Sequence, residues 1–525
     1  MIKHGFLVAA VLFLVLGHVP FSAAHARQDQ PPFIYYYSTQ LNSFVIERTD
    51  GTDSTLLGQG LVTEPVLYGA EWSGAGHWLL WRGGGAPYTD PAIYGAVRYD
   101  GSRTLESLKQ LVGITAAWSP NNDDRLMVLA PYRLPEGETH AEFYPAVYII
   151  DAEQDRIVQE TPLDEAYVVA QWSSDGRYIV LLDHMLDDLL VVVPTDGSSI
   201  LTRPAEYVTD RYFYGPRLSW TPDGRAIYRR PGTDRMVIEE FSTGESLEFP
   251  FTTGETRRIE WNGDQALLFV SDEDSTQLWR LSLSDPSLTM ITDDTVYPGL
   301  EADLNPVYAP NFSSQIWTPD GARALVPKTD GKLYWYHAAD GTLTEAGIPP
   351  MDAEAFPLMR VQWSDPYAFV LWGNDAYLMD LASDQVVQSF EAVSAAEGFL
   401  RFDYTLSPDG RSLAHLGTCD GSRSVGYCIW DWAAGTTVYL DPNPLMENPG
   451  LPYPRAFWLP NTDVLVLAEN GETVYGYDDF FWSIALPDGS LYRQLTEHSL
   501  VPPQLLPANV DTSQISPTEE SVSGR

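Results

Sequence analysis

The chain has 525 residues, a length that allows two or three average domains or one large all-β unit. Its 72 acidic and 31 basic residues give a formal net charge of −41. Such a chain repels phosphate backbones, which argues against nucleic acid as a partner and leaves cationic partners, metal ions or solubility as reasons for the charge. We expect a monomer, because dispersed carboxylates keep a protein soluble and apart from its copies.

The N-terminus has the parts of a secretory signal peptide. Lys3 and His4 precede an apolar run from Phe6 to Gly17, and Ala24-His25-Ala26 supplies small residues for cleavage between Ala26 and Arg27. The apolar run is shorter than the roughly 20 residues of a membrane-spanning helix, so a membrane anchor is less favoured. We predict a signal peptide over residues 1–26, a short linker over 27–32, and an exported chain, extracellular or periplasmic, with no membrane insertion.

One short pattern recurs through the rest of the chain: an apolar residue, Trp, Ser or Thr, a Pro-Asp-Gly-like turn, and then an apolar run rich in β-forming residues. The copies are anchored at Trp72, Trp118, Trp172, Trp220, Trp261, Trp317, Trp363, Leu406 and Trp458. Their spacing matches the roughly 40 to 50 residues of one four-stranded propeller blade. We expect the anchor tryptophans to end the first strand of each unit and to fill the gap between adjacent blades.

Each unit contains two tight hairpins. In the anchored turn, Pro sets φ for the second position and Gly accepts a conformation that a bulky residue resists. A second turn signal follows at Asp100-Gly101, Asp196-Gly197, Thr243-Gly244, Asp340-Gly341, Ala434-Gly435 and Asp488-Gly489. Each unit is therefore predicted as strand a, tight turn, strand b, variable loop, strand c, tight turn and strand d.

The two ends of the chain complete one another. Phe33 to Ser38 and Phe44 to Arg48 look like strands b and c of a unit that lacks strand a, and Gln504 to Pro507 lies where that strand is needed. Closing the ring in this way also removes exposed sheet edges. The prediction is an all-β propeller of about ten blades over residues 33–510, followed by a disordered tail over 511–525. Ten exceeds the usual four to eight or so, which leaves two smaller propellers or eight to nine blades as alternatives.

The Trp-Ser-Pro-Asp-Gly-Arg hairpin at blade spacing resembles the TolB-type propeller repeat, which is related in architecture to WD-repeat proteins. The form is best kept at Trp220 to Arg225 and Leu406 to Arg411, whereas the copies at Trp72, Trp261 and Trp363 depart from it and leave those blade boundaries open. The resemblance covers nearly the whole chain after the leader. It implies an exported protein of bacterial type, since such repeats occur in periplasmic interaction modules and in the propeller parts of prolyl-oligopeptidase-like enzymes.

The strand order predicts two different faces. Since strands alternate in direction, both tight turns of every unit lie on one face of the ring and the long loops lie on the other. Those loops are rich in aromatic and acidic residues, as expected either of a binding surface or of a chain with 29 Tyr and 72 acids. The candidate binding residues are Tyr144, Tyr212, Tyr214, Tyr297, Tyr475 and Tyr477. We predict a non-catalytic binding or scaffold module for a protein, a peptide or a glycan stacked on tyrosines.

Cys419 and Cys428 are the only cysteines of the chain. Asp420-Gly421-Ser422 and Gly426 lie between them, which favours a disulfide across a loop on the same face. A metal site with two cysteines would need further ligands from elsewhere and is less favoured.

No catalytic centre is recognisable. Gly417 to Gly421 matches Gly-x-nucleophile-x-Gly, but that motif needs a strand-to-helix turn and these residues fall between predicted strands. No His-Glu-x-x-His zinc pattern occurs among the histidines that follow the leader, which are His77, His140, His184, His337, His415 and His498. We assign no catalytic, cofactor-binding or metal residue, and a hydrolase or lyase with a site assembled across blades is the alternative.

Calcium is the one cofactor that the sequence suggests, and only weakly. The acidic clusters Asp272 to Asp274 and Asn121 to Asp124 offer oxygen ligands, but neither has the alternating spacing and glycine of an EF-hand loop. The acid pairs Asp187-Asp188 and Asp478-Asp479 are what glycoside chemistry uses. Adjacent acids are also expected by composition in so acidic a chain.

Overall fold

The computed structural model describes residues 31–514 except for 59–66, 84–92, 114, 122, 134–141, 166, 168, 183–188, 208–217, 234, 251–254, 272–274, 297–315, 352–358, 374, 392–404, 418–425, 433, 441–454, 471–479, 497–498 and 500.

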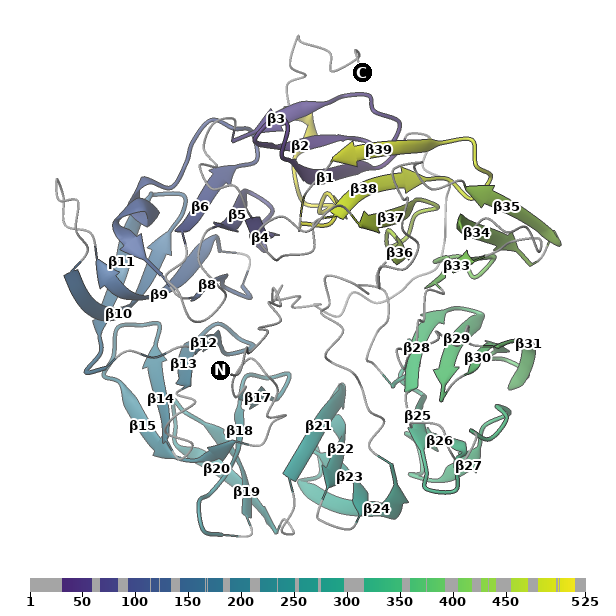
Figure 1. Ribbon diagram of the computed structural model, residues 1–525. Helices are drawn as coiled ribbons and strands as arrows, with labels where there is room; N and C mark the ends of the chain where they lie inside the picture. The colour runs from purple at the N-terminus through teal and green to yellow at the C-terminus, as the bar shows by residue number, and fades with distance from the viewer. Residues whose placement is uncertain are drawn as a thin grey trace, which may run out of the picture.

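 The described residues form ten separate sheets arranged in one closed ring, a ten-bladed β-propeller (Figure 1).

The first five blades follow the chain from its N-terminal end. Blade 1 contains β40 (Gln504–Leu505), β1 (Phe33–Ser38), β2 (Ser43–Arg48) and β3 (Thr55–Leu57). Blade 2 contains β4 (Leu67–Trp72), β5 (Trp78–Gly83) and β6 (Ile93–Arg98), and a 3₁₀ turn, η1 (Glu106–Gln110), follows it. Blade 3 contains β7 (Leu111–Val112), β8 (Thr115–Trp118), β9 (Arg125–Arg133), β10 (Glu142–Asp151) and β11 (Arg156–Pro162). Blade 4 contains β12 (Val169–Trp172), β13 (Tyr178–Leu182), β14 (Leu189–Pro194) and β15 (Leu201–Pro204). Blade 5 contains β16 (Glu206–Tyr207), β17 (Ser219–Trp220), β18 (Ala226–Arg229), β19 (Arg235–Glu240) and β20 (Glu245–Pro250).

The other five blades complete the ring. Blade 6 contains β21 (Glu255–Asn262), β22 (Gln265–Ser271), β23 (Thr276–Ser282) and β24 (Ser287–Thr295). Blade 7 contains β25 (Arg323–Pro327), β26 (Leu333–His337) and β27 (Leu343–Glu345). Blade 8 contains β28 (Met359–Ser364), β29 (Tyr367–Trp372), β30 (Asp375–Asp380) and β31 (Gln385–Glu391). Blade 9 contains β32 (Thr405–Leu406), β33 (Ser412–Gly417), β34 (Gly426–Asp431) and β35 (Thr436–Leu440). Blade 10 contains β36 (Arg455–Trp458), β37 (Leu465–Asn470), β38 (Phe480–Ala485) and β39 (Tyr492–Thr496), and η2 (Thr512–Gln514) follows β40.

The blades have the predicted four-strand plan. Every sheet is antiparallel, and where blades 2 and 7 show three strands, the single bridges Val97↔Thr104 and Trp317↔Ala324 mark the fourth. The middle strands are apolar runs because blades stack face to face and bury both of their surfaces, as in β14. The outer strand β11 alternates exposed and half-buried residues instead, because one edge of each blade faces water.

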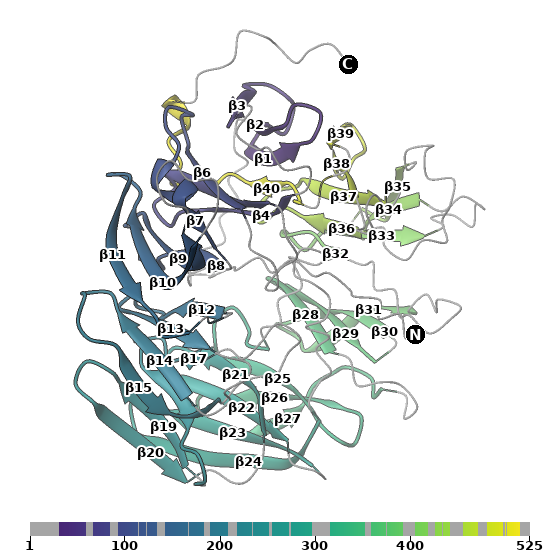
Figure 2. The same ribbon diagram turned by 60° about the vertical axis from the view of Figure 1, so that its left-hand side comes forward.

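The ring closes as the two chain ends predict. Ile34 pairs with Leu505 and Tyr35 with Gln504, so β40 is the inner strand of blade 1, and Figure 2 shows the yellow β40 beside the purple β1. Arg493 of β39, in the neighbouring blade 10, forms a 2.7 Å ion pair with Glu47 of β2. The prediction of a single ring of ten blades is therefore confirmed, and the alternatives of two smaller propellers or of eight to nine blades are wrong.

The anchor tryptophans lie between blades. In four cases the indole Nε1 donates a hydrogen bond to a backbone carbonyl in strand a of the preceding blade, at 3.0 to 3.2 Å. These donors and acceptors are Trp118 and Glu71, Trp172 and Ala117, Trp317 and Glu260, and Trp458 and Thr405. The acceptor residue directly precedes the anchor of its own blade, so the same contact recurs around the ring.

Both tight turns of a blade lie on one face, which we call the turn face. In blade 2 the amide of Tyr99, after strand c, donates to the carbonyl of His77 in the a–b turn at 2.9 Å, and in blade 4 Thr195 donates to Arg177 in the same way at 3.0 Å. The glycines of all six predicted c–d turns have φ between 67° and 80°. Among the described residues, no helix is long and apolar enough to cross a membrane.

Candidate functional site

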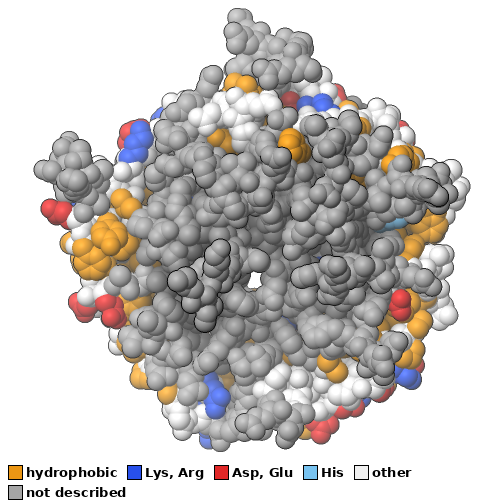
Figure 3. Space-filling model, in the orientation of Figure 1, with side chains coloured by type: hydrophobic (Ala, Val, Ile, Leu, Met, Phe, Trp, Pro, Cys, Tyr) orange, Lys and Arg blue, Asp and Glu red, His pale blue; other side chains and the backbone are white. Residues whose placement is uncertain are grey.

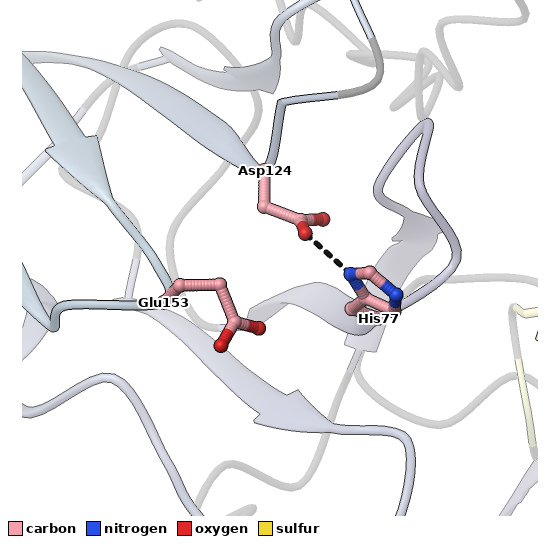
Figure 4. Close-up of side chains that lie close together, drawn as sticks. All are labelled: His77, Asp124 and Glu153. Carbon is pink, nitrogen blue, oxygen red and sulfur yellow. Dashed lines mark hydrogen bonds and ion pairs between the residues drawn. The ribbon is translucent and has the colours of Figure 1, made fainter.

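A cluster of three metal-ligating side chains lies on the turn face where blade 2 meets blade 3. It consists of His77, Asp124 and Glu153 (Figure 4), and we call it the 2–3 junction cluster. His77 ends the a–b turn of blade 2, Asp124 ends the a–b turn of blade 3, and Glu153 follows β10 in the c–d turn of blade 3. Three tight turns therefore bring together residues that are 47 and 76 positions from His77 in the sequence.

His77 is positioned by the repeat itself. The Ser73 amide donates to the Trp78 carbonyl at 2.8 Å, and Ser73 Oγ accepts a hydrogen bond from the Trp78 amide at 3.3 Å. The turn of blade 4 has the same two bonds between Ser173 and Tyr178. His77 therefore occupies the place that Arg177 occupies in blade 4, at the end of the Pro-Asp-Gly-Arg type of turn.

Asp124 has an unusual place for an aspartate. Its φ of 50° lies in the left-handed region, where the repeat uses glycine, and Gly224 has a φ of 87° in the matching turn of blade 5. Asp124 is only 6% exposed, and its Oδ2 lies 2.6 Å from Nδ1 of His77. Its other oxygen, Oδ1, is buried and has no hydrogen-bond partner among the described residues.

Glu153 is held by two side chains of blade 2. Trp78 Nε1 donates to its Oε1 at 3.2 Å, and Arg103 Nη2 lies 3.0 Å from its Oε2. Arg103 also donates to the Glu153 backbone carbonyl at 3.0 Å, and its guanidinium lies 5.4 Å from the centre of the Trp78 ring. These bonds fix the carboxylate against the junction.

The cluster offers one imidazole nitrogen and two carboxylate oxygens, and these ligand atoms lie within 4.8 Å of one another. An imidazole with two carboxylates is a donor set that suits a divalent transition metal. The cluster can therefore hold a cation or hold two blades together.

Sequence reasoning missed this cluster for an identifiable reason. His77 belongs to no short zinc motif, Asp124 lies in an acidic run without a marked partner, and no sequence pattern marks Glu153. The available signal was the repeat in register, because His77 replaces an arginine and Asp124 replaces a glycine in two neighbouring blades. A ligand set shared between blades has no fixed spacing in the sequence.

Of the predicted binding residues, the structure describes Tyr144. This side chain is 37% exposed, and its hydroxyl donates to Glu160 Oε1 at 3.0 Å, which raises the pKa of Tyr144. Tyr212, Tyr214, Tyr297, Tyr475 and Tyr477 lie outside the described residues, as do Ala26 and Arg27 at the predicted cleavage site.

Tyr144 belongs to a partly exposed aromatic group that we call the aromatic rim patch: Tyr132, Phe143 and Tyr144. Phe143 is 61% exposed, and its ring lies 5.6 Å from that of Tyr132 on the neighbouring strand. Figure 3 shows hydrophobic side chains gathered at the left edge of the molecule, where Figure 1 places β10 and β11. The patch lies at the end of the β9–β10 pair opposite to the turn face, because Arg133 pairs with Glu142 there and Arg125 with Asp151 at the other end.

The predicted disulfide has one described member. Cys428 is fully buried in β34, opposite His415 of β33. Cys419 lies outside the described residues, so its pairing with Cys428 stays a prediction.

One half-buried acid of strand a was not expected from the sequence. Burial raises the pKa of Glu71, the residue before the Trp72 anchor, to about 8. Blade 4 has Gln171 at this position, and its amide exchanges two hydrogen bonds with the backbone of Leu218 in blade 5, each at 3.2 Å. Gln362 of blade 8 exchanges the same two hydrogen bonds with the backbone of Leu406 in blade 9, so an uncharged amide suits this position.

The sequence matches no protein-family model, and no curated protein matches it. Solved structures are similar at low identity. A eukaryotic initiation factor is 13% identical over 90% of this chain and 98% of that chain, with a TM-score of 0.46. TolB from Acinetobacter baumannii is 16% identical over 70% of this chain and 81% of that chain, with a TM-score of 0.22. The Cps50 (Swd1) β-propeller domain of Myceliophteria thermophila is 14% identical over 60% of this chain and 94% of that chain, with a TM-score of 0.27.

The class of protein is therefore defined by its architecture, a ten-bladed propeller with TolB and WD-type propellers among similar structures. The likeness concerns the fold and carries no argument about activity or partner. The bacterial type of source that the repeat implies stays a prediction.

Proposed function

We propose that the chain is an exported, non-catalytic binding or scaffold propeller that takes a protein, peptide or glycan partner on its loop-rich face. The observation that carries the proposal is the aromatic rim patch. A Phe that is 61% exposed beside two tyrosines is unusual on a soluble surface, where isolated apolar residues are the norm. Aromatic residues supply much of the binding energy at interfaces and stack on sugar rings.

The surroundings of the patch suit recognition. Its rings stand on β9 and β10, two of the longest strands of the propeller, so the backbone beneath them is rigid. Glu160 and Arg133 form a 3.3 Å ion pair beside Tyr144, which gives the patch a polar border. A rigid aromatic centre with a polar rim is the usual arrangement of a binding surface.

The test compares two matched surface variants in a screen of glycan and peptide arrays. Phe143→Ser with Tyr144→Ser should weaken binding of the ligands that the wild type retains by about tenfold or more. The control, Val387→Ser, changes a 45% exposed apolar residue on β31 of blade 8 and should leave binding unchanged. Equal binding by the double variant and the wild type would remove the patch from the proposal. Turnover of any arrayed substrate would contradict a non-catalytic role.

Export is a separate part of the proposal. The chain should be recovered outside the cytoplasm, extracellular or periplasmic, as a monomer without membrane insertion. Sequencing its N-terminus should give Arg27 as the first residue. Recovery with residues 1–26 attached would contradict cleavage at the predicted site.

A further inference from the structure

We propose that His77, Asp124 and Glu153 bind a divalent transition-metal ion, with zinc as the preferred ion, at the junction of blades 2 and 3. The site is independent of the aromatic rim patch, which lies at the opposite end of the blade 3 strands. The ion would tie two adjacent blades together at the turn position where blade 4 has Arg177.

The first support is the geometry of the ligand atoms. Zinc binds imidazole nitrogen and carboxylate oxygen at about 2.0 to 2.2 Å, which places neighbouring ligand atoms roughly 3 to 4 Å apart. The three ligand atoms of the cluster already lie within 4.8 Å of one another, so small side-chain rotations are enough. The ion would take the place of the proton between His77 Nδ1 and Asp124 Oδ2, and the neutral imidazole would keep its proton on Nε2.

The second support is the unpaired oxygen of Asp124. The residue is more than nine-tenths buried, and its Oδ1 has no hydrogen-bond partner among the described residues. A buried carboxylate oxygen without a partner is costly. Coordination of a cation by the Asp124 carboxylate would compensate for that cost.

The third support is the way Glu153 is held. Trp78 and Arg103 each occupy one lone pair of its carboxylate, and a carboxylate offers about four such positions. Bonds of this kind orient a metal ligand from outside. The charge of Arg103 opposes a cation, but the two carboxylates and the net charge of −41 outweigh it.

The choice of ion follows from His77. Imidazole suits zinc and its neighbours among the transition metals, whereas calcium and magnesium prefer oxygen ligands alone. The side chain of His77 is 44% exposed, so an ion can enter from water. The calcium that the acidic run Asn121 to Asp124 suggested is therefore not the ion that this junction favours.

The experiment uses the purified chain after treatment with a chelator and titrates it with zinc by calorimetry, with calcium as the comparison ion. The wild type should bind zinc tightly at one site and gain thermal stability from it. His77→Arg copies the arrangement at Arg177, so it should fold normally while its zinc affinity falls by about 100-fold or more. His337→Arg, which changes a histidine of blade 7, should bind zinc as the wild type does.

Two results would overturn the proposal. One is a wild type that binds no zinc at micromolar concentration, and the other is His77→Arg with unchanged zinc affinity. Asp124→Asn provides a second check, because it keeps the shape of the side chain and should also weaken zinc binding. A variant that binds normally after this change would likewise contradict the site.

Discussion

The junction between blades 2 and 3 and the junction between blades 4 and 5 use the same turn positions for different chemistry. In blade 4, Arg177 pairs with Asp175 of its own turn and, at 2.8 Å, with Glu240, the last residue of strand c of blade 5. At the junction of blades 2 and 3, His77 stands in place of Arg177. Glu153 of blade 3 approaches it from the c–d turn, two residues beyond Asp151, which stands in place of Glu240. A permanent charge is thus replaced by a group that can bind a metal.

At both junctions an aspartate lies beside the end of the a–b turn, but it comes from a different blade in each case. Asp175 lies directly against Gly224 of blade 5, where any Cβ would collide with it. Blade 2 has Ala75 in place of Asp175, which leaves room for the side chain of Asp124 from blade 3. The aspartate is therefore supplied by the first blade at the junction of blades 4 and 5 (Asp175) and by the second blade at the junction of blades 2 and 3 (Asp124).

The largest expected effect tests how far the junction of blades 2 and 3 depends on its anchor tryptophan. Trp118→Ala removes a buried ring and its hydrogen bond to the Glu71 carbonyl, and we expect a loss of about 3 to 5 kcal/mol in the free energy of unfolding. Denaturant unfolding measures it. Trp118→Phe keeps most of the ring and should cost much less. A loss below about 1 kcal/mol for the alanine variant would show that the ring is not important for packing.

The next effect concerns Glu71, which stands where blade 4 has Gln171. Between its ordinary value of 4.5 and its raised pKa of about 8, the unfolded chain loses the proton while the folded chain keeps it, so stability falls as pH rises through this range. The slope is at most about 1.4 kcal/mol per pH unit. Glu71→Gln should remove it and be more stable than the wild type at pH 8. Equal melting temperatures of the two proteins at pH 5 and at pH 8 would contradict this.

A smaller effect is expected at the arginine junction. Arg177→Ala removes the pairs with Asp175 and Glu240, but the side chain is 46% exposed, so the cost should be about 0.5 to 1 kcal/mol and should shrink in high salt. Urea unfolding at two salt concentrations measures this. A cost that does not depend on salt would point to packing of the arginine chain instead.

The smallest effect separates the fold from the proposed metal site. Asp124→Gly restores the residue that the repeat uses at this left-handed position and removes a buried unpaired oxygen, at the loss of the contact with His77. Without metal, its stability should be within about 0.5 kcal/mol of the wild type. With zinc, only the wild type should gain melting temperature. Equal gains in both proteins would exclude Asp124 as a ligand.

Much of the fold could be predicted because the information is local and repeated. The anchors from Trp72 to Trp458 mark the ends of strands a, and the pairs of Gln504 with Tyr35 and of Leu505 with Ile34 confirm the predicted closure. The sequence leaves more than one blade number open, because the copies of the motif at Trp72, Trp261 and Trp363 depart from the repeat and do not mark the strand boundaries. The sequence predicts Tyr144 as an exposed binding residue, whereas it does not distinguish the more exposed Phe143 beside it.

The sequence by itself determined the repeat, the two tight turns of each blade and the strand that closes the ring, since turn chemistry and alternating apolar runs act over a few residues. Only the tertiary structure decided that His77, Asp124 and Glu153 meet, because their contact depends on how one blade packs against the next. It also decided that the Glu71 carboxyl is removed from water, which raises its pKa. Such contacts arise between turns that are far apart in the chain, and no local pattern specifies them.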